Sequence, residues 1–279
     1  MTVRFAEGVI FVNKTVGFIG CGNMGGALAA AAAKAVDKNN IFVSDADAKK
    51  AEAFSEKYGV KSAAVSDVAK NADYIFLGVK PQILKSLFSE IGEILSARES
   101  RVVLISMAAG VNIASLTALA GKEYPVIRIM PNMPVSVGEG MILFDANSAV
   151  SEAEITEFKE LMRFAGELDR LEESKIDAAS CVSGCGPAFV YLFIEALADG
   201  AVACGLPRDK ALKYAAQTLA GSAKALLESG KHPGEMKDAV CSPAGSTIQG
   251  VRALEEGAFR SDAMNAVIKA YERTLELGK

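Results

Sequence analysis

A glycine-rich stretch near the start of the chain has the residue types and spacing that hold a dinucleotide. Gly20, Gly22 and Gly25 form a G-x-G-x-x-G pattern that follows a short apolar run and opens an alanine-rich helical segment. The first glycine permits a tight turn, the second lets a pyrophosphate approach the backbone, and the third lets the helix lie close to the sheet. Free N–H groups at the start of the helix attract the phosphates. We predict dinucleotide binding here, with a plain glycine-rich turn as the alternative.

An acidic residue follows at the distance that such a site requires. Asp45 closes the second expected strand, about 20 residues after Gly25, where an acidic side chain accepts from the hydroxyls of the adenosine ribose. A carboxylate there repels a 2′-phosphate, which favours NADH over NADPH. Lys49 and Lys50 follow closely and weaken this inference, and capping of the next helix is the alternative role for Asp45.

A loop of small residues near the C-terminus is the second candidate for chemistry. Gly245, Ser246 and Thr247 would direct backbone N–H groups and two hydroxyls at one point where a helix begins. Such a helix start attracts anions, so the pattern predicts a site for a carboxylate. A simple capped helix start is the alternative.

The residue types exclude several other kinds of site. His232 is the single histidine of the chain, so a histidine-rich metal centre or a histidine dyad is excluded. The five cysteines are scattered without a C-x-x-C pair, and Cys181 and Cys185 lack a further pair of ligands. We predict free, mostly buried thiols, no metal site and a reducing compartment, the cytoplasm.

The elements around the glycine motif are expected to form an α/β domain. Apolar runs predict strands at 15–19, 41–44, 73–79, 101–106 and 126–130. Helical patterns lie between them at 24–36, 46–58 and 81–95. Strands that alternate with helices form a parallel, doubly wound sheet with right-handed crossovers. Smaller elements are expected as a strand at 60–61, a helix capped by Ser66, a helix from a Ser151–Glu154 capping box to about 164, and a strand at 166–171.

Ligands of such a sheet bind at the carboxyl ends of the strands. The loops expected there are 79–81, 107–110 and 130–134. Small residues at 108–110 would let a flat nicotinamide ring pack on the backbone. Lys80 either faces the cofactor or is a solvated lysine at the end of a strand.

The pattern changes beyond about residue 172, and we expect two domains, 1–172 and 173–279. Long helical patterns follow at 187–204, 208–229, 246–256 and 261–277. Residues 188–203 are apolar nearly all round, and such a helix must be covered on every side. A second subunit is expected to supply the cover, and the alternative is the central helix of a monomeric bundle. The glycines and proline of 183–188 should break the helix, either to open a substrate floor or only as a helix entry.

Composition excludes further classes of partner. A net charge of −4 argues against a nucleic-acid or anionic-membrane surface. No unbroken run of eighteen apolar residues is present, so no membrane span is expected. The first thirteen residues, a possible extension, include an apolar patch at 9–12 that is not typical of a signal peptide and is either a short extra strand or part of an upstream start.

Six segments together resemble one known family, the pyrroline-5-carboxylate reductases. They are G-F-I-G-C-G-N-M-G at 17–25, V-K-P at 79–81, A-A-G-V at 108–111, R-I-M-P-N-M-P at 128–134, S-G-C-G-P-A-F at 183–189 and H-P-G-E-M-K-D-A-V-C-S-P-A-G-S-T-I at 232–248. The resemblance covers nearly the whole chain beyond the first dozen residues. It implies an N-terminal Rossmann domain, an all-α C-terminal domain that forms a homodimer or a higher oligomer of dimers, and reduction of L-1-pyrroline-5-carboxylate to L-proline with NADPH or NADH.

The resemblance also implies roles for individual residues. Thr247 would hydrogen-bond the ring nitrogen, and Ser242, Gly245, Ser246 and Thr247 would hold the substrate. Pro134 and Asn132 would shape the nicotinamide side. The expected cofactor-binding residues are Gly20, Gly22, Asn23, Met24, Gly25, Ser44, Asp45, Val79, Lys80, Pro81, Ala108 and Asn132. Because the cyclic imine carries its own basic nitrogen, Thr247 is expected to position the substrate rather than act as a strong acid.

Four residues depart from the family pattern. Ala244 replaces a usual glycine and needs a backbone conformation that tolerates a Cβ, and Ser246 replaces the usual residue before the threonine. Cys185 replaces a serine, and Asp45 replaces a small polar residue. Two other functions compete. A β-hydroxyacid or imine reductase would typically need a catalytic lysine or aspartate on the long helix, and it is disfavoured because 183–203 offers only Glu195 and Asp199. A non-catalytic nucleotide sensor would leave the 241–247 loop merely structural.

Overall fold

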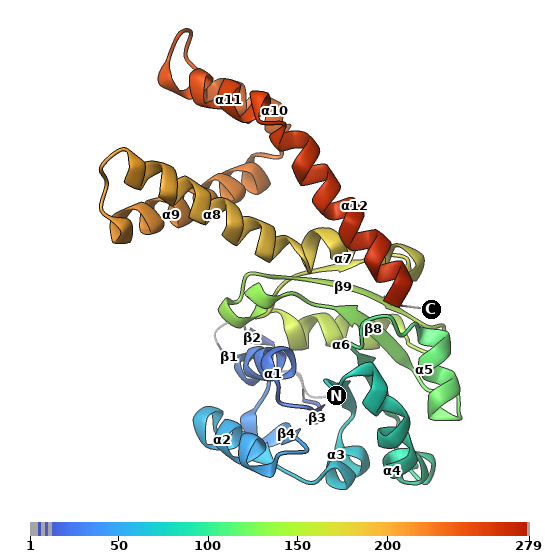
Figure 1. Cartoon of the computed structure of the whole chain (residues 1–279). Helices are drawn as coiled ribbons and strands as arrows, with labels where there is room; N and C mark the ends of the chain where they lie inside the picture. Colours follow the sequence, from blue (N-terminus) through green and yellow to red (C-terminus); the bar gives the residue numbers. More distant parts are fainter. Residues whose placement is uncertain (1–4, 7–8, 11–12, 278–279) are drawn as a thin grey trace. The chain divides into compact units, whose positions relative to one another are not determined.

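An eight-stranded sheet is the centre of the N-terminal part of the computed structural model, which describes residues 5–6, 9–10 and 13–277 (Figure 1). The order across the sheet is β10-β9-β8-β7-β6-β3-β4-β5. Neighbouring strands are parallel except β8 and β9, which are antiparallel. The strands are β3 (Val16–Ile19), β4 (Ile41–Ser44), β5 (Lys61–Ser62), β6 (Tyr74–Leu77), β7 (Val103–Ser106), β8 (Val126–Met130), β9 (Gly140–Ala146) and β10 (Gly166–Arg170).

Helices pack on both faces of this sheet, as the alternation of strands and helices predicts. The face with Phe18 and Phe76 is covered by α1 (Asn23–Ala35), α2 (Ala48–Tyr58) and α6 (Glu152–Met162). The face with Ile19 and Leu77 is covered by α3 (Val65–Asn71), α4 (Leu84–Ser96) and α5 (Ile113–Ala120). Short 3₁₀ turns stand at η1 (Lys38–Asn40), η2 (Pro81–Ile83) and η3 (Met133–Val137). Because consecutive strand residues point to opposite faces, continuously apolar strands fill both layers.

The expected doubly wound fold is confirmed, with differences in detail. The capping box of Ser151 and Glu154 is present at the start of α6. The predicted Ser66 cap is wrong, because the extended backbone of Ala64 starts α3 and Ser66 lies inside its first turn. The sequence reading missed α5 and β9. Strand β9 turns back antiparallel to β8 after η3, so it interrupts the strand–helix alternation from which the other strands were inferred.

Two short paired strands precede the sheet in sequence. Strand β1 (Phe5–Ala6) pairs antiparallel with β2 (Val9–Ile10). The apolar patch expected to form an extra strand at 9–12 is therefore a strand over its first two residues, and residues 11–12 lie outside the described part of the chain.

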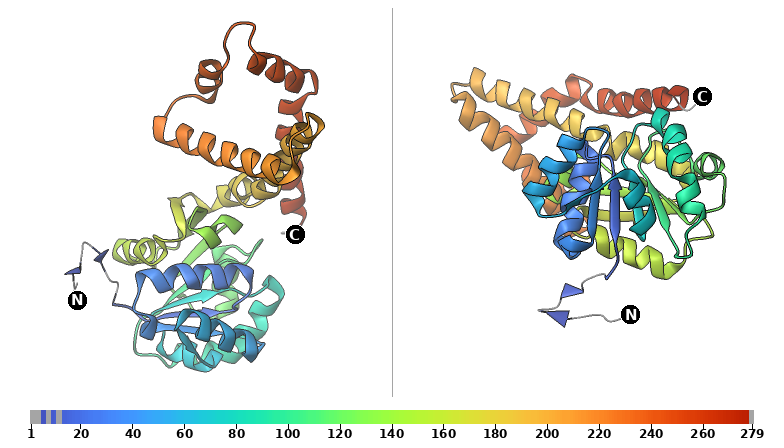
Figure 2. Two further views of the ribbon diagram at one scale, coloured as in Figure 1. Left: turned by 90° about the vertical axis from the view of Figure 1, so that its left-hand side faces the viewer. Right: turned by 90° about the horizontal axis from the view of Figure 1, so that it is seen from below.

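The C-terminal part is helical, as predicted. Its helices are α7 (Glu173–Ser183), α8 (Gly186–Ala203), α9 (Arg208–Ser229), α10 (Pro233–Val240), α11 (Ser246–Glu256) and α12 (Phe259–Leu277). The sequence reading missed α7 and the eight-residue α10. Helices α8 and α9 pack against each other (Figure 2). The chain divides into two compact units, one of residues 1–184 and 271–279, here called the sheet unit, and one of residues 185–270, the helical unit.

The expected break before the long apolar helix is slight. Gly184 and Cys185 separate α7 from α8, yet both keep right-handed helical backbone angles. Within the described residues, the run Glu173–Ala203 is the one helical stretch long and apolar enough to cross a membrane by length and composition. No unbroken apolar run reveals it in the sequence because Glu195 and Asp199 lie within it. The apolar helix of an oligomer has the same character, so this finding alone is weak evidence for a membrane span.

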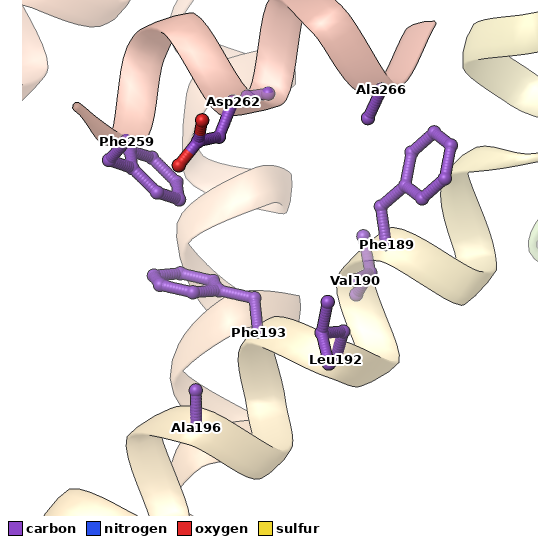
Figure 3. A pocket seen from close by; sticks show the side chains of 9 residues that line it. Phe189, Val190, Leu192, Phe193, Ala196, Phe259, Asp262 and Ala266 are labelled. Carbon is purple, nitrogen blue, oxygen red and sulfur yellow. The ribbon is translucent and has the colours of Figure 1, made fainter. Parts of the chain in front are cut away.

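The helical unit buries little of its apolar surface. Its buried apolar residues, all of its positions being described, are Ala198, Ala211 and Ala215. Large apolar side chains are exposed along α8 and α9, including Val190, Tyr191, Leu192, Leu197, Leu212, Tyr214 and Leu227. A groove of about 450 Å³ opens between α8 and the start of α12, where the rings of Phe193 and Phe259 lie 5.3 Å apart (Figure 3).

Candidate functional site

The glycine loop at the carboxyl end of β3 is closely packed at two of its glycines and open at the third. Gly20 has a φ of +104°, and a Cβ there would lie 2.4 Å from the carbonyl oxygen of Gly78. A Cβ on Gly25 would lie 2.1 Å from the carbonyl oxygen of Gly20. A Cβ on Gly22 would meet nothing within 4 Å. Side chains are therefore excluded at the turn and at the helix packing, and space remains beside Gly22, where a phosphate would approach.

The start of α1 leaves backbone donors for an anion. Gly22 is the N-cap residue, and among the described residues no side chain caps this end of the helix. The first turn contains Asn23 and Met24 and lacks acidic residues; Asn23 is exposed and Met24 is half-buried. The first N–H groups of a helix have no intrahelical acceptor, so they present a partial positive charge beside Gly22.

The end of β4 lies directly against this loop. The N–H of Gly20 donates to the carbonyl of Ser44 at 2.7 Å. The Asp45 carboxylate accepts from the Cys21 N–H at 2.8 Å and from the Asp47 N–H at 3.0 Å. Helix α2 is capped by Asp47, which accepts from the Lys49 N–H, so the alternative role of Asp45 as the helix cap is wrong.

A pocket of about 370 Å³ opens beside Asp45. Small side chains from the end of β4, from α2 and from the segment after β5 form most of its wall, which consists of Ser44, Asp45, Ala48, Ala51, Ser62, Ala63, Ala64 and Val65. Burial, and secondarily the charge of Asp45, raises the pKa of the neighbouring Cys21 thiol to about 11. A raised pKa keeps this thiol protonated near pH 7, so it adds no second negative charge beside Asp45.

The other expected cofactor residues lie at the carboxyl ends of β6, β7 and β8. Val79 is half-buried, Lys80 is exposed, and Pro81 begins η2. Ala108 is buried just beyond β7. Because the carboxyl ends of parallel strands lie at the same end of the sheet, these positions and the glycine loop lie at that end.

The side-chain amide of Asn132 is hydrogen-bonded within the protein at both its nitrogen and its oxygen. Its Nδ2 donates to the carbonyl of Ser183 at 2.9 Å, and its Oδ1 accepts from the Met141 N–H at 2.9 Å. The side chain is buried and joins the end of β8 to β9 and to the last turn of α7. The arrangement gives Asn132 a structural role in holding the 131–134 loop, which sequence reasoning did not anticipate.

The expected substrate loop forms a turn that leads into α11. The N–H of Gly245 donates to the carbonyl of Ser242 at 3.0 Å, and Gly245 is the N-cap residue of the helix. Ser242, Ser246 and Thr247 are exposed. Within the described residues no side chain caps α11, so its first N–H groups are available to an anion. This loop belongs to the helical unit, whereas the glycine loop and Asp45 belong to the sheet unit.

Ala244 does not adopt the conformation expected for a residue with a Cβ. Its φ is +57°, in the left-handed region that favours glycine. It follows Pro243 in the third position of the turn, the position at which a type II turn requires a positive φ. The turn geometry therefore overrides the preference of alanine at this position.

A buried arginine was missed by sequence reasoning. Arg128 on β8 is 4% exposed and contacts Asp177 of α7 at 2.5 Å and Glu173 at 3.4 Å. Glu173 also accepts from the Ile113 N–H at 2.7 Å. Arg128 stands alone among apolar residues in V-I-R-I-M, and a charge in such a strand signals a buried partner. This network ties α7 to the sheet.

Comparison with known proteins identifies relatives along the whole chain. Residues 173–277 match the family described as pyrroline-5-carboxylate reductase dimerisation, and residues 15–110 match NADP oxidoreductase, coenzyme F420-dependent. The chain is 41% identical to the pyrroline-5-carboxylate reductase of Escherichia coli over 271 residues, covering 96% of this chain and 100% of the relative.

Solved structures of the same enzyme are also similar. The pyrroline-5-carboxylate reductase of Coxiella burnetii superposes with a TM-score of 0.88 at 33% identity, covering 96% of this chain and 100% of that one. The pyrroline carboxylate reductase of Plasmodium falciparum, solved with NADP bound, gives a TM-score of 0.84 at 33% identity with the same coverage.

Proposed function

Because the chain belongs to the pyrroline-5-carboxylate reductase family, we propose that it reduces L-1-pyrroline-5-carboxylate to L-proline, the last step of proline biosynthesis. The observation that carries this proposal is the similarity over nearly the full length of both chains, at 41% identity, to a protein of that name. It includes both the glycine loop and the 232–248 segment. The nucleotide sensor is disfavoured because curated relatives at 38–42% identity, from a bacterium, a fish, an archaeon and a plant, are reductases by name.

The sheet unit uses NADH or NADPH, and its residues fit this group. The open space at Gly22 and the free N–H groups at Asn23 and Met24 suit the pyrophosphate. The pocket beside Ser44 and Asp45 suits the adenosine end. Val79, Lys80, Pro81 and Ala108 stand where the nicotinamide end would lie, and Asn132 holds the neighbouring loop. The bound cofactor supplies the hydride that the imine carbon accepts.

The loop of the helical unit binds and orients the imine in this proposal. The first N–H groups of α11, at Ser246 and Thr247, hold the carboxylate, and Ser242 and Gly245 form the turn beside them. The hydroxyl of Thr247 donates to the ring nitrogen and keeps the imine carbon in position. Orientation of this kind supplies up to roughly 7–11 kcal/mol of barrier reduction in favourable cases.

The C-terminal helical domain forms a homodimer. The family match to a dimerisation domain and the exposed apolar side chains of α8 and α9 support this assembly. We further propose a domain boundary in the sequence at 172–173, since the dimerisation match begins at residue 173; α7 then belongs to the dimerisation domain in sequence, although it packs within the sheet unit. In this view the apolar helix α8 is covered by the second subunit rather than by lipid, and the enzyme acts in the cytoplasm as a dimer or as a higher oligomer of dimers.

The direct test is NADH or NADPH oxidation at 340 nm by the purified full chain with L-1-pyrroline-5-carboxylate, and with L-proline identified as the product. We expect turnover that depends on the imine and yields one proline for each cofactor oxidised. A folded chain that binds the cofactor but oxidises neither NADH nor NADPH in the presence of this imine would contradict the proposal.

A further inference from the structure

Asp45 is held beside the phosphate-binding loop through both of its carboxylate oxygens. Oδ2 accepts from the Cys21 N–H at 2.8 Å, and Oδ1 accepts from the Asp47 N–H at 3.0 Å. The hydrogen bond from the Gly20 N–H to the Ser44 carbonyl fixes the end of β4 against the same turn. The carboxylate therefore cannot swing away from the loop without losing two hydrogen bonds.

The pocket beside Asp45 has no positive side chain to offset this charge. Among the described residues that line it, none is Lys or Arg. Ala48 and Ala51 are the residues that α2 contributes. At about 100° per residue, Lys49 and Lys50 point away from the face that these alanines share, and both are exposed. Lys61 on β5 lies over the ring of Phe42 instead.

We propose that Asp45 makes this chain select NADH over NADPH. The proposal rests on the proposed function only for the class of cofactor. The 2′-hydroxyl of an adenosine ribose donates to a carboxylate, whereas a 2′-phosphate brings negative charge to a carboxylate that is already negative. Sites that bind a 2′-phosphate usually offset its charge with a lysine or arginine. The residues that line this pocket include neither.

The selectivity is an electrostatic one, which distinguishes it from a steric barrier. Ala48, Ala51, Ser62 and Ala63 leave room beside the carboxylate, so added volume is not what the pocket rejects. Repulsion between charges near the surface weakens as salt rises. The preference of the native chain for NADH should therefore narrow at high ionic strength.

The experiment is a fluorescence titration of the full chain with NADH and with NADPH, without imine, at low and high salt. Three variants are compared with the native chain: Asp45→Asn, Asp45→Ser, and the control Asp169→Asn. Asp169 is an exposed residue on β10, at the opposite edge of the sheet from β5, and its substitution removes the same charge.

We expect the native chain and Asp169→Asn to bind NADH about tenfold or more tighter than NADPH at low salt. In both Asp45 variants the dissociation constants of NADH and NADPH should lie within about threefold of each other, mainly because NADPH binds more tightly. Equal affinity for both cofactors in the native chain would overturn the proposal, as would an unchanged ratio in both Asp45 variants. Because the titration contains no imine, a chain that shows the expected ratio but reduces no pyrroline-5-carboxylate would contradict the proposed function alone.

Discussion

The sheet unit and the helical unit treat apolar side chains in opposite ways. In the sheet unit, large side chains such as Phe18, Tyr74, Phe76 and Phe144 are buried between two layers of helices. In the helical unit the fully buried side chains are alanines, while Leu192 is 69% and Tyr191 is 61% exposed. A core of alanines contributes little hydrophobic stabilisation, since buried apolar area sets its size.

This difference indicates which unit buries its apolar surface without a second copy of the chain. The sheet unit closes its own core and holds the residues proposed to bind the cofactor. The helical unit leaves apolar surface far in excess of its core, as expected of half of an obligate dimer. The loop proposed to bind the substrate lies in the unit that needs a partner, so catalysis should depend on assembly while cofactor binding should not.

The largest expected effect separates the two loops. Thr247→Ala should lower kcat by about 10²–10³-fold, because a donor to the reacting imine is lost. The dissociation constant of NADH should change less than about twofold, since the sheet unit holds the cofactor. Steady-state rates and NADH titrations measure the two quantities. Thr247→Ser, which keeps the hydroxyl, is the control, and parallel losses of rate and cofactor affinity in Thr247→Ala would contradict the division of roles.

The next effect concerns the exposed apolar surface of α8. Leu192→Asp should weaken dimerisation by about a hundredfold or more, because a charge would be buried in the interface. Sedimentation velocity over a dilution series measures the change. Leu119→Asp is the matched control, since Leu119 is exposed on α5 of the sheet unit and should leave assembly unchanged. An unchanged dimer in Leu192→Asp would show that the surface around this residue is not the interface.

The stability of the sheet unit should depend strongly on Arg128. Arg128→Met leaves Asp177 and Glu173 without their buried cation and should lower the free energy of unfolding by about 2–4 kcal/mol, discounted because both carboxylates are partly exposed. Urea unfolding measures the loss. Arg170→Met removes the ion pairs that the exposed Arg170 makes with Glu152 and, at 3.7 Å, with Asp145, and should cost less than about 1 kcal/mol. Equal losses would mean that burial of Arg128 has no special weight.

The smallest effect is the pH dependence of Glu154. Its hydrogen bonds with Arg101 lower its pKa to about 2, with the Ser151 capping box adding to the shift. The ionised carboxylate therefore adds stability above about pH 4.5, and this contribution is lost as the pH falls toward 2. Because Arg101 is 58% exposed, we expect Glu154→Gln to cost about 1–2 kcal/mol at pH 7.

Urea unfolding of native and variant chains between pH 2 and pH 7 measures this dependence. The two curves should converge toward acid pH. Glu152→Gln, at the exposed neighbouring position, should follow the native curve closely. A constant difference between native and Glu154→Gln at every pH would contradict an electrostatic origin.

Much of the sheet unit could be predicted from the sequence because its pattern is local. Apolar strands, the glycine loop and the capping box each depend on neighbouring residues. Strand β9 could not be predicted because its antiparallel return interrupts the alternation of strands and helices. The hydrogen bonds of Asn132 could not be predicted because they depend on the return of β9, which brings Met141 close, and on Ser183, which lies 51 residues along the chain. The left-handed backbone of Ala244 could not be predicted because the geometry of the turn outweighs the preference of alanine for a negative φ. The apolar surface of α8 could be predicted, since a helix apolar on all sides is visible in the sequence.

The most direct test of the account is the rate of imine-dependent NADH oxidation per milligram of native chain, measured across the concentrations over which sedimentation shows the dimer dissociating. We expect this specific rate to stay constant while the dimer persists and to fall in proportion to the dimer fraction, with NADH binding retained throughout. A monomer that reduces pyrroline-5-carboxylate as fast as the dimer would contradict the claim that the helical unit functions only when a second copy completes it.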